Sequence, residues 1–252
     1  MILEVTDLRK EFGGLMAVFD VSFRVASEEI LAIIGPNGAG KTTTFNLLSG
    51  VLSPSKGEIR FGGWQLNGMR PYAIARIGLT RTFQNVQLFG NMTVLENVMV
   101  GLHGHLRYGL LGAAFRPPGV RREERQVRVQ AMDALDRVGL ADRAGESAAN
   151  LPFGQQRLLE IARALATAPK LLMLDEPGSG LNRPEKEELG DLIRAIRADG
   201  VTVLLVEHDM PLVMGIADRI VVLEYGQKIA EGTPAEIQAN QRVIDAYLGE
   251  VQ

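Results

Sequence analysis

Apolar and polar positions alternate along the chain in a way that predicts strands and helices in turn. Short stretches rich in β-branched and aromatic residues predict strands at Ile2–Leu8, Val18–Val25, Ile30–Ile34 and Glu58–Phe61. The stretch Ile30–Ile34 reads ILAII without a polar residue. That pattern is typical of a strand buried on both faces of a parallel sheet. We therefore expect an α/β fold built around such a sheet.

The same alternation resumes after residue 160. The apolar run Leu171–Leu174 predicts a strand, a helix is expected from about Arg183 to Ala198, and Val201–Val206 predicts the next strand. A final helix and hairpin are expected to follow.

The middle of the chain has helical patterning instead. Thr93 and Glu96 are spaced as a capping box, which predicts a helix that continues to about Leu102. A second, highly charged helix is expected over Arg121–Val138, after a loop rich in Gly, Pro and Leu at residues 104–119. The simplest arrangement is a single domain, residues 1–252, whose α/β core is interrupted by a helical subdomain at approximately 86–160.

Composition narrows the class of protein. The chain has a formal net charge of -3 and no cysteine, so we expect neither a nucleic-acid partner nor a disulfide framework. Its apolar runs are far shorter than the ~18 residues that would suggest a membrane span. We expect a cytosolic protein that does not cross a bilayer by itself.

The segment after Ile30–Ile34 fits the G-x-x-x-x-G-K-[ST] pattern of phosphate-binding loops. Glycines let successive backbone N–H groups turn toward an anion, and the helix behind the loop aims its positive end there. Lys41 can then reach the β- and γ-phosphates of a nucleotide, and the Thr42 hydroxyl can bind Mg²⁺. The strand before the segment and the apolar helix after it favour this interpretation over a chance glycine-rich turn. The predicted nucleotide-binding residues of the loop are Gly35, Asn37, Gly38, Ala39, Gly40, Lys41, Thr42 and Thr43.

Two carboxylates follow the apolar run Leu171–Leu174. Asp175 and Glu176 are expected at the carboxyl end of a central strand, where open α/β sheets bind ligands. Asp175 is the expected Mg²⁺ partner, and Glu176 is the candidate to orient or deprotonate an attacking water. Alone, Asp-Glu-Pro at a strand end is more often an ordinary turn. Combined with the phosphate loop, it predicts a Mg²⁺-dependent nucleoside triphosphatase.

The segment Leu151–Arg157, LPFGQQR, resembles the signature motif of ABC ATPases, which is normally Leu-Ser-Gly-Gly-Gln. Two positions depart from it, because Pro152 replaces the Ser and Phe153 replaces the first Gly. Proline is tolerated at the first turn of a helix, so the positive end of that helix should persist. The resemblance implies that Phe153, Gly154 and Gln155 act on the ATP held by a second chain.

Further positions match motifs of the same family. Gln84, in RTFQ, resembles the Q-loop glutamine, and His208 resembles the switch histidine that contacts the γ-phosphate. Phe12 stands where the family places an aromatic ring on adenine, and Ser179–Asn182 resembles the D-loop, with Asn in place of the usual Asp. The resemblance therefore implies catalysis by Glu176, His208 and Gln84, and metal binding by Thr42, Gln84 and Asp175.

The resemblance extends over nearly the whole chain and implies its fold, cofactors and partners. The expected fold is a P-loop NTPase core, RecA-like and of the ABC ATPase type, with the helical signature subdomain inserted. The expected cofactors are ATP and Mg²⁺. The partners would be a second ATP-binding subunit, identical or different, and two transmembrane permease subunits. The chain would thus lie on the cytoplasmic face of the cell membrane.

Four segments look like the ATP-binding subunits of branched-chain amino acid importers: RTFQNVQLF, PFGQQ, EHDMPLVMG and VIDAYLGE. Such systems also contain a solute-binding protein. The implied role is to power uptake of branched-chain amino acids or related small solutes by closure and reopening of a dimer. Similar subunits serve urea and short-chain amides, and a related ATPase serves lipopolysaccharide export. The sequence leaves the choice among these cargoes open.

Two other classes of protein agree less well with this sequence. A soluble ABC ATPase that acts on ribosomes or DNA usually carries two ATPase domains or a long coiled-coil arm, and this sequence has neither. A GTPase would carry the guanine-reading pattern Asn-Lys-x-Asp, which is absent.

The phosphate loop generates a direct prediction. Lys41→Ala should weaken nucleotide binding itself, because it removes the cation expected at the β- and γ-phosphates. Equilibrium binding of ATP to the purified variant checks this, and an unchanged affinity would count against the assigned role of the lysine.

Overall fold

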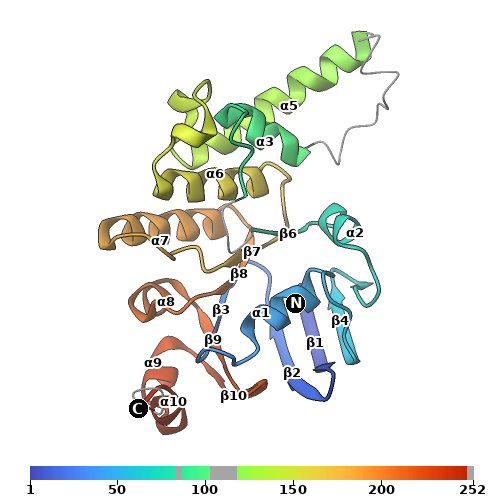
Figure 1. The fold of residues 1–252 in the computed structure, drawn as a ribbon, viewed down its shortest axis with the longest axis vertical. Helices are drawn as coiled ribbons and strands as arrows, with labels where there is room; N and C mark the ends of the chain where they lie inside the picture. The colour runs from blue at the N-terminus through green and yellow to red at the C-terminus, as the bar shows by residue number, and fades with distance from the viewer. Residues whose placement is uncertain (83–86, 103–117, 249–252) are drawn as a thin grey trace. The chain divides into compact units, whose positions relative to one another are not determined.

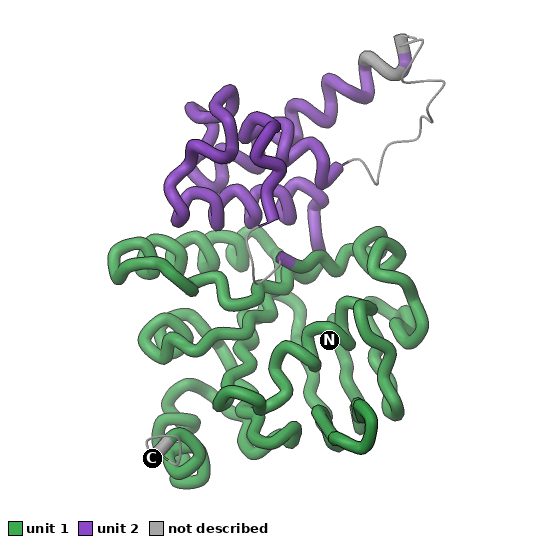
Figure 2. The backbone as a smooth tube through the Cα atoms, viewed as in Figure 1, with its two compact units in different colours: residues 1–81, 170–252 green, residues 82–169 purple. Residues whose placement is uncertain are grey.

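The structure is a computed structural model that describes residues 1–82, 87–102 and 118–248. The chain forms two compact units, Met1–Arg81 with Lys170–Gln252, and Thr82–Pro169 (Figure 2). The helical subdomain predicted at about 86–160 falls within the residue range of the second unit. Its role as a distinct functional part stays a prediction.

The first unit contains a six-stranded sheet (Figure 1). Its strands lie in the order β10 (Gln227–Gly232), β9 (Arg219–Glu224), β3 (Ile30–Ile34), β8 (Thr202–Val206), β7 (Leu171–Asp175) and β6 (Leu79–Arg81). All neighbours pair in parallel except β10, which runs antiparallel to β9. Every residue of β3, β7 and β8 is buried. The prediction of a parallel sheet with fully buried strands is confirmed.

A second sheet of the same unit is antiparallel. Its strands lie in the order β2 (Leu15–Val25), β1 (Leu3–Phe12), β4 (Lys56–Phe61) and β5 (Trp64–Gln65). β1 continues to Phe12, beyond the predicted end at Leu8, although three of its last four residues are polar and none of the four is buried. Backbone pairing with β2 through a hairpin, with register shifts along it, extends the strand past its apolar part.

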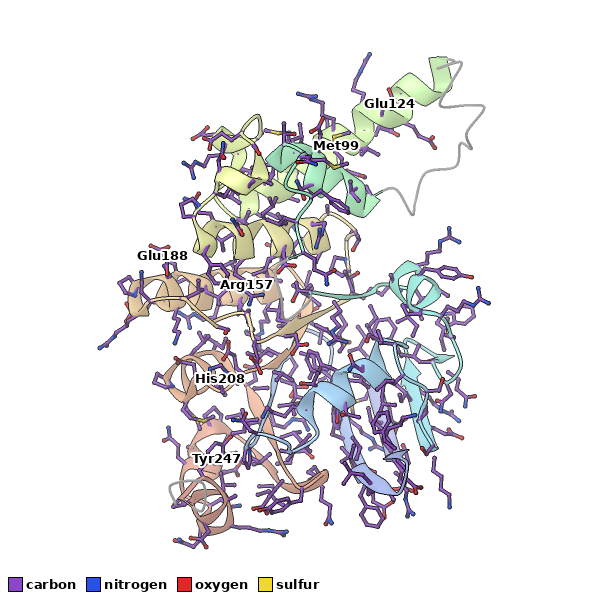
Figure 3. The ribbon with its side chains drawn as sticks, viewed as in Figure 1. Met99, Glu124, Arg157, Glu188, His208 and Tyr247 are labelled. Carbon is purple, nitrogen blue, oxygen red and sulfur yellow. The ribbon has the colours of Figure 1, made fainter. Side chains whose placement is uncertain are left out.

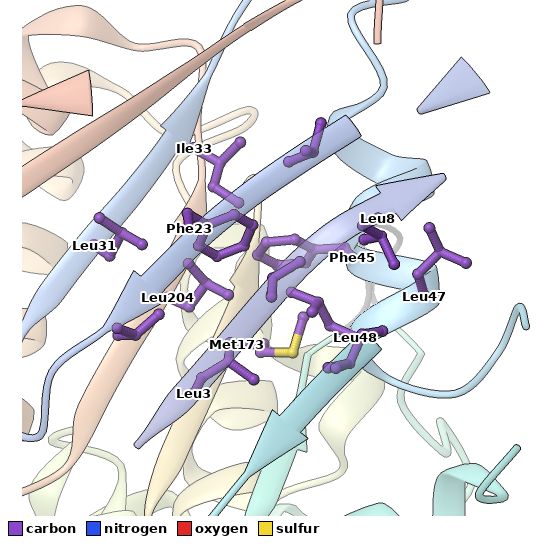
Figure 4. Close-up of a cluster of buried hydrophobic side chains, with 14 of the residues drawn as sticks. Leu3, Leu8, Phe23, Leu31, Ile33, Phe45, Leu47, Leu48, Met173 and Leu204 are labelled. Atoms are coloured by element: carbon purple, nitrogen blue, oxygen red, sulfur yellow. The ribbon is translucent and has the colours of Figure 1, made fainter. Parts of the chain in front are cut away.

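The main core lies between these two sheets (Figure 4). Leu31 and Ile33 of β3 share one face of the six-stranded sheet because they are two residues apart. Met173 of β7 and Leu204 of β8 join them, together with Phe45 of helix α1 (Lys41–Leu48), and all five side chains are fully buried. The packing fixes both ends of the segment that joins β3 to α1, which is the predicted phosphate loop.

The remaining helices of the first unit follow the later strands. They are α2 (Pro71–Arg76), α7 (Arg183–Ala198), α8 (Met210–Ile216), α9 (Pro234–Gln238) and α10 (Gln241–Leu248). The helix predicted at Arg183–Ala198 is confirmed, and its start has a physical cause. The Asn182 side chain accepts a hydrogen bond from the Glu185 N–H, and the Glu185 carboxylate accepts one from the Asn182 N–H. The D-loop asparagine is thus half of a capping box.

The described part of the second unit is helical. It contains α3 (Val94–Leu102), α5 (Pro118–Arg137), the 3₁₀ turns η2 (Ala141–Arg143) and η3 (Ala148–Asn150), and α6 (Phe153–Leu165). Thr93 and Glu96 form the predicted capping box at the start of α3. Gly139 adopts a φ of 71° just after α5, as a helix-ending glycine does. Across the described ranges, no helix has the length and apolar character needed to cross a membrane.

Candidate active site

The predicted phosphate loop joins the carboxyl end of β3 to the start of α1, and its backbone requires glycine at two points. Gly35 has a φ of 151°, and a Cβ there would lie 2.1 Å from the Leu223 carbonyl oxygen. Gly40 has a φ of 95°, and a Cβ there would lie 2.5 Å from the Ala17 carbonyl oxygen. Any larger residue would therefore push the loop away from the neighbouring backbone.

The loop and the start of α1 contain groups that can bind an anion. Helix α1 starts at Lys41 without a side-chain cap and without an acidic residue in its first turn. Its positive end is therefore not neutralised by its own side chains. The Lys41 ammonium donates to the carbonyl oxygens of Gly35 and Pro36 at 2.6 and 2.8 Å, so it lies along the loop itself. Asn37 and Thr42 are exposed, and Thr43 is half-buried.

Asp175 lies at the last position of β7, and its side chain is 1% exposed. One carboxylate oxygen forms an ion pair with the Arg81 guanidinium at 2.7 Å. Arg81 also donates to the Asn46 amide oxygen at 2.7 Å and to the Ser49 hydroxyl at 3.0 Å. Asn46 belongs to α1, and Ser49 is the residue that directly follows this helix. The predicted metal ligand is thus tied to the helix that follows the phosphate loop. The sequence alone does not predict a role for Arg81 at the site. The signal that could have indicated one is a cationic residue at the end of a short strand, β6.

Glu176 follows directly and has an unusual backbone. Its φ is 48°, a left-handed conformation that is uncommon outside glycine, Asn and Asp. Its N–H donates to the Val206 carbonyl oxygen at 2.9 Å, which ties the turn to β8. The side chain is 20% exposed, and one carboxylate oxygen lies 3.9 Å from Nδ1 of His208. The two predicted catalytic residues therefore lie together.

His208 lies on the turn after β8, and its side chain is 60% exposed (Figure 3). The next residue, Asp209, caps α8 by accepting from the Leu212 N–H, and it also accepts from the Lys186 ammonium of α7. Burial alone would raise the pKa of Asp209, but the hydrogen bonds from Lys186 and Leu212 outweigh it and lower that pKa. Asp209 therefore stays ionised and anchors the histidine turn to α7 and α8.

The other predicted site residues are placed as follows. Phe12 ends β1 with 44% of its surface exposed, and the Lys10 ammonium lies 5.0 Å from its ring centre. In the second unit Phe153 and Gly154 open α6, with Pro152 as the residue before the helix. Gln155 accepts a hydrogen bond from the Arg143 guanidinium. Gln84 lies outside the described residues.

Within the part of the chain that the structure describes, a magnesium ion would find only some of its ligands. Among the described residues there is no group of three or more His, Cys, Asp or Glu side chains that could hold a metal. Asp175 and the Thr42 hydroxyl offer oxygen, which Mg²⁺ prefers, and this ion usually takes its other ligands from water and substrate phosphates. The residues present therefore fit a metal that arrives with a nucleotide.

Comparison with protein families gives two matches. A profile described as "ABC transporter" matches residues 18–179. A second profile, described as "Branched-chain amino acid ATP-binding cassette transporter", matches residues 227–251.

Similar proteins extend over nearly the full chain. It is 50% identical over 250 residues to the high-affinity branched-chain amino acid transport ATP-binding protein BraF of Pseudomonas aeruginosa, with 99% of this chain and 98% of that protein covered. It is 48% identical over 250 residues to the protein of the same description, LivG, of Escherichia coli K12, with the same coverage.

Solved structures show the same fold. A nucleotide-free ATP-binding cassette of an ABC transporter matches with a TM-score of 0.86 and 31% identity, covering 98% of both chains. A dimeric bacterial ABC transporter cassette matches with a TM-score of 0.77 and 26% identity, covering 92% of this chain and 99% of that one.

The buried ion pair of Arg81 and Asp175 generates a stability prediction. Arg81→Met should leave the carboxylate buried without its cation and lower the free energy of unfolding by about 3–5 kcal/mol. Arg60→Met is the matched control, because Arg60 and Glu58 form an exposed pair, with side chains 60% and 51% exposed. That change should cost no more than about 1 kcal/mol. Urea denaturation of the nucleotide-free proteins measures both, and equal losses would contradict the assignment.

Proposed function

Because this chain belongs to the ABC transporter family of ATP-binding proteins, we propose that it hydrolyses ATP to drive uptake of branched-chain amino acids, or of related small solutes, through a membrane transporter. The reaction is supported by the position of four residues at the carboxyl edge of the six-stranded sheet. Lys41 starts the helix after β3, Asp175 ends β7, and Glu176 and His208 lie on the turns after β7 and β8. The substrate class rests on the 50% identity to a transport protein of that description, together with the second profile match.

The phosphate loop supplies the binding step. Backbone N–H groups and the start of α1 hold the phosphates, and Lys41 moves from its own loop carbonyls to the β- and γ-phosphates. Phe12, exposed at the end of β1, stacks on the adenine ring. The other residues proposed to bind the nucleotide are Gly35, Asn37, Gly38, Ala39 and Gly40 of the loop, and Thr42 and Thr43 in the first turn of α1.

The turns after β7 and β8 supply the hydrolytic step. Thr42, Asp175 and Gln84 hold Mg²⁺, which when bound neutralises negative charge on the phosphates. Glu176 accepts a proton from the attacking water or orients it, and its left-handed backbone keeps the carboxylate at the strand end. His208 lies on the neighbouring turn, with its Nδ1 3.9 Å from the Glu176 carboxylate, and contacts the γ-phosphate.

A second ATP-binding subunit completes the reaction. Phe153, Gly154 and Gln155 of the second unit act on the nucleotide of that subunit, at the start of α6 where no side chain caps the helix. Likeness to a dimeric cassette supports this arrangement. The described helices α3, α5 and α6 belong to the helical subdomain that we propose at approximately 86–160, and α6 starts with this signature segment.

The transported solute passes through other subunits. Two permeases span the membrane, a solute-binding protein delivers the cargo, and this chain acts on the cytoplasmic face. The likeness of this chain to transport ATP-binding proteins supports the presence of permease partners.

The test is the behaviour of Glu176→Gln. The variant should keep ATP affinity, lose about 10²- to 10⁴-fold in turnover and accumulate as an ATP-bound dimer, because only the proton acceptor is removed. ATP hydrolysis, nucleotide binding and size-exclusion chromatography measure the three quantities. Glu188→Gln, at an exposed position of α7 (Figure 3), is the control and should behave as the wild type.

In cells, uptake of radiolabelled leucine through the complete transporter should fail with Glu176→Gln and persist with Glu188→Gln. Normal turnover by Glu176→Gln would mean that the catalytic acid is misassigned. Normal leucine uptake without a functional copy of this chain would overturn the proposed substrate class.

A further inference from the structure

Glu207 is a fully buried carboxylate in the first unit, and the reaction described above does not use it. It follows the last residue of β8 and precedes His208, and its side chain is 0% exposed. A buried charge is unfavourable unless hydrogen bonds compensate it. The hydrogen bonds that compensate the buried charge of Glu207 therefore indicate its structural role.

The two carboxylate oxygens of Glu207 serve two different turns. Oε1 accepts a hydrogen bond from the Gly178 N–H at 2.6 Å, on the turn after β7. Oε2 accepts from the N–H groups of His208 at 2.9 Å and Asp209 at 3.2 Å, on the turn after β8. Three backbone donors thus satisfy this carboxylate, and one side chain connects both turns.

The Glu207 carboxylate lies so close to Gly178 that this position has no room for a side chain. A Cβ at Gly178 would lie 2.7 Å from Oε1 of Glu207 and 3.2 Å from a methyl group of Leu212. The same turn contains Glu176, whose carbonyl oxygen accepts from the Ser179 N–H at 3.1 Å. The carboxylate of Glu207 therefore holds the turn of the proposed proton acceptor directly at its backbone.

We propose that Glu207 is a positioning residue that fixes the Glu176 turn and the His208 turn relative to each other. The inference rests on the proposed ATPase function and deepens it. Because Glu207 is buried, it acts through its neighbours and not on the nucleotide. The spacing that it sets is the 3.9 Å between His208 Nδ1 and the Glu176 carboxylate, and small misplacements of catalytic groups lower turnover strongly.

Glu207→Gln is the first test, because it keeps the size of the side chain. A glutamine has one acceptor oxygen, and its NH₂ group would face an N–H of one of the two turns. One connection is therefore lost. We expect kcat to fall by on the order of 10- to 100-fold while the ATP dissociation constant changes less than about threefold. A parallel loss of ATP affinity and kcat would indicate a merely structural role and overturn the proposal, as would an unchanged kcat.

A pair of compensating substitutions tests the contact itself. Gly178→Ala adds a methyl group against Oε1, and Glu207→Asp withdraws the carboxylate by one methylene. Each alone should lower kcat, whereas the double variant should recover at least part of that loss because the methyl group fills the space that Asp leaves. Gly215→Ala on α8 is the control, since a Cβ there meets no atom within 4 Å. Additive losses in the double variant would overturn the proposal.

Amide hydrogen exchange separates this inference from the proposed function. In the nucleotide-free protein the amides of Gly178, His208 and Asp209 should be protected, and in Glu207→Gln at least one of the two turns should exchange faster by about tenfold or more. Unchanged exchange would overturn the inference even if the wild type hydrolyses ATP. A wild type that fails to hydrolyse Mg²⁺-ATP would instead overturn the proposed function, and the exchange result would still stand.

Discussion

The parallel pairing of β3, β8 and β7 is the constraint on which the candidate site depends. Ile33 pairs with Val206, and Val206 pairs with Asp175, so the three strands end at the same edge of the sheet. Parallel strands present their carboxyl ends together, and ligands bind at that edge in open α/β sheets. The phosphate loop, the two acids and the histidine turn therefore meet there, although more than 170 residues separate Gly35 from His208 in the chain.

Much of the fold and the family could be predicted from local patterns. The run Ile30–Ile34 predicts a buried strand by itself, because a strand buried on both faces has no polar position. The phosphate loop, the capping box at Thr93 and the Arg183–Ala198 helix are equally local. The family and the ATPase activity follow from motifs of this kind, and the profile match over residues 18–179 confirms the family.

The features of the fold and the site that could not be predicted depend on contacts between segments far apart in the chain. A single sequence does not show such contacts. Arg81 and Asp175 are far apart in the chain, and so are Gly178 and Glu207, yet each pair forms a buried contact. The sequence indicates a D-loop position at Asn182, and only the structure shows that its side chain caps α7. The extension of β1 to Phe12 follows from pairing with β2 and not from its own residues. The roles of the site residues, Gln84 included, stay predictions.

The left-handed backbone of Glu176 has a consequence for how this edge of the sheet can vary. A non-glycine residue with φ near 48° is less stable by roughly 1–2 kcal/mol than the same residue in a right-handed conformation. The surrounding turn maintains that conformation through the Glu176 N–H bond to Val206. The direction of the side chain is thus set by main-chain geometry. Exchanging the carboxylate for an isosteric amide leaves the turn intact, whereas inserting or deleting a residue beside it would redirect the group entirely.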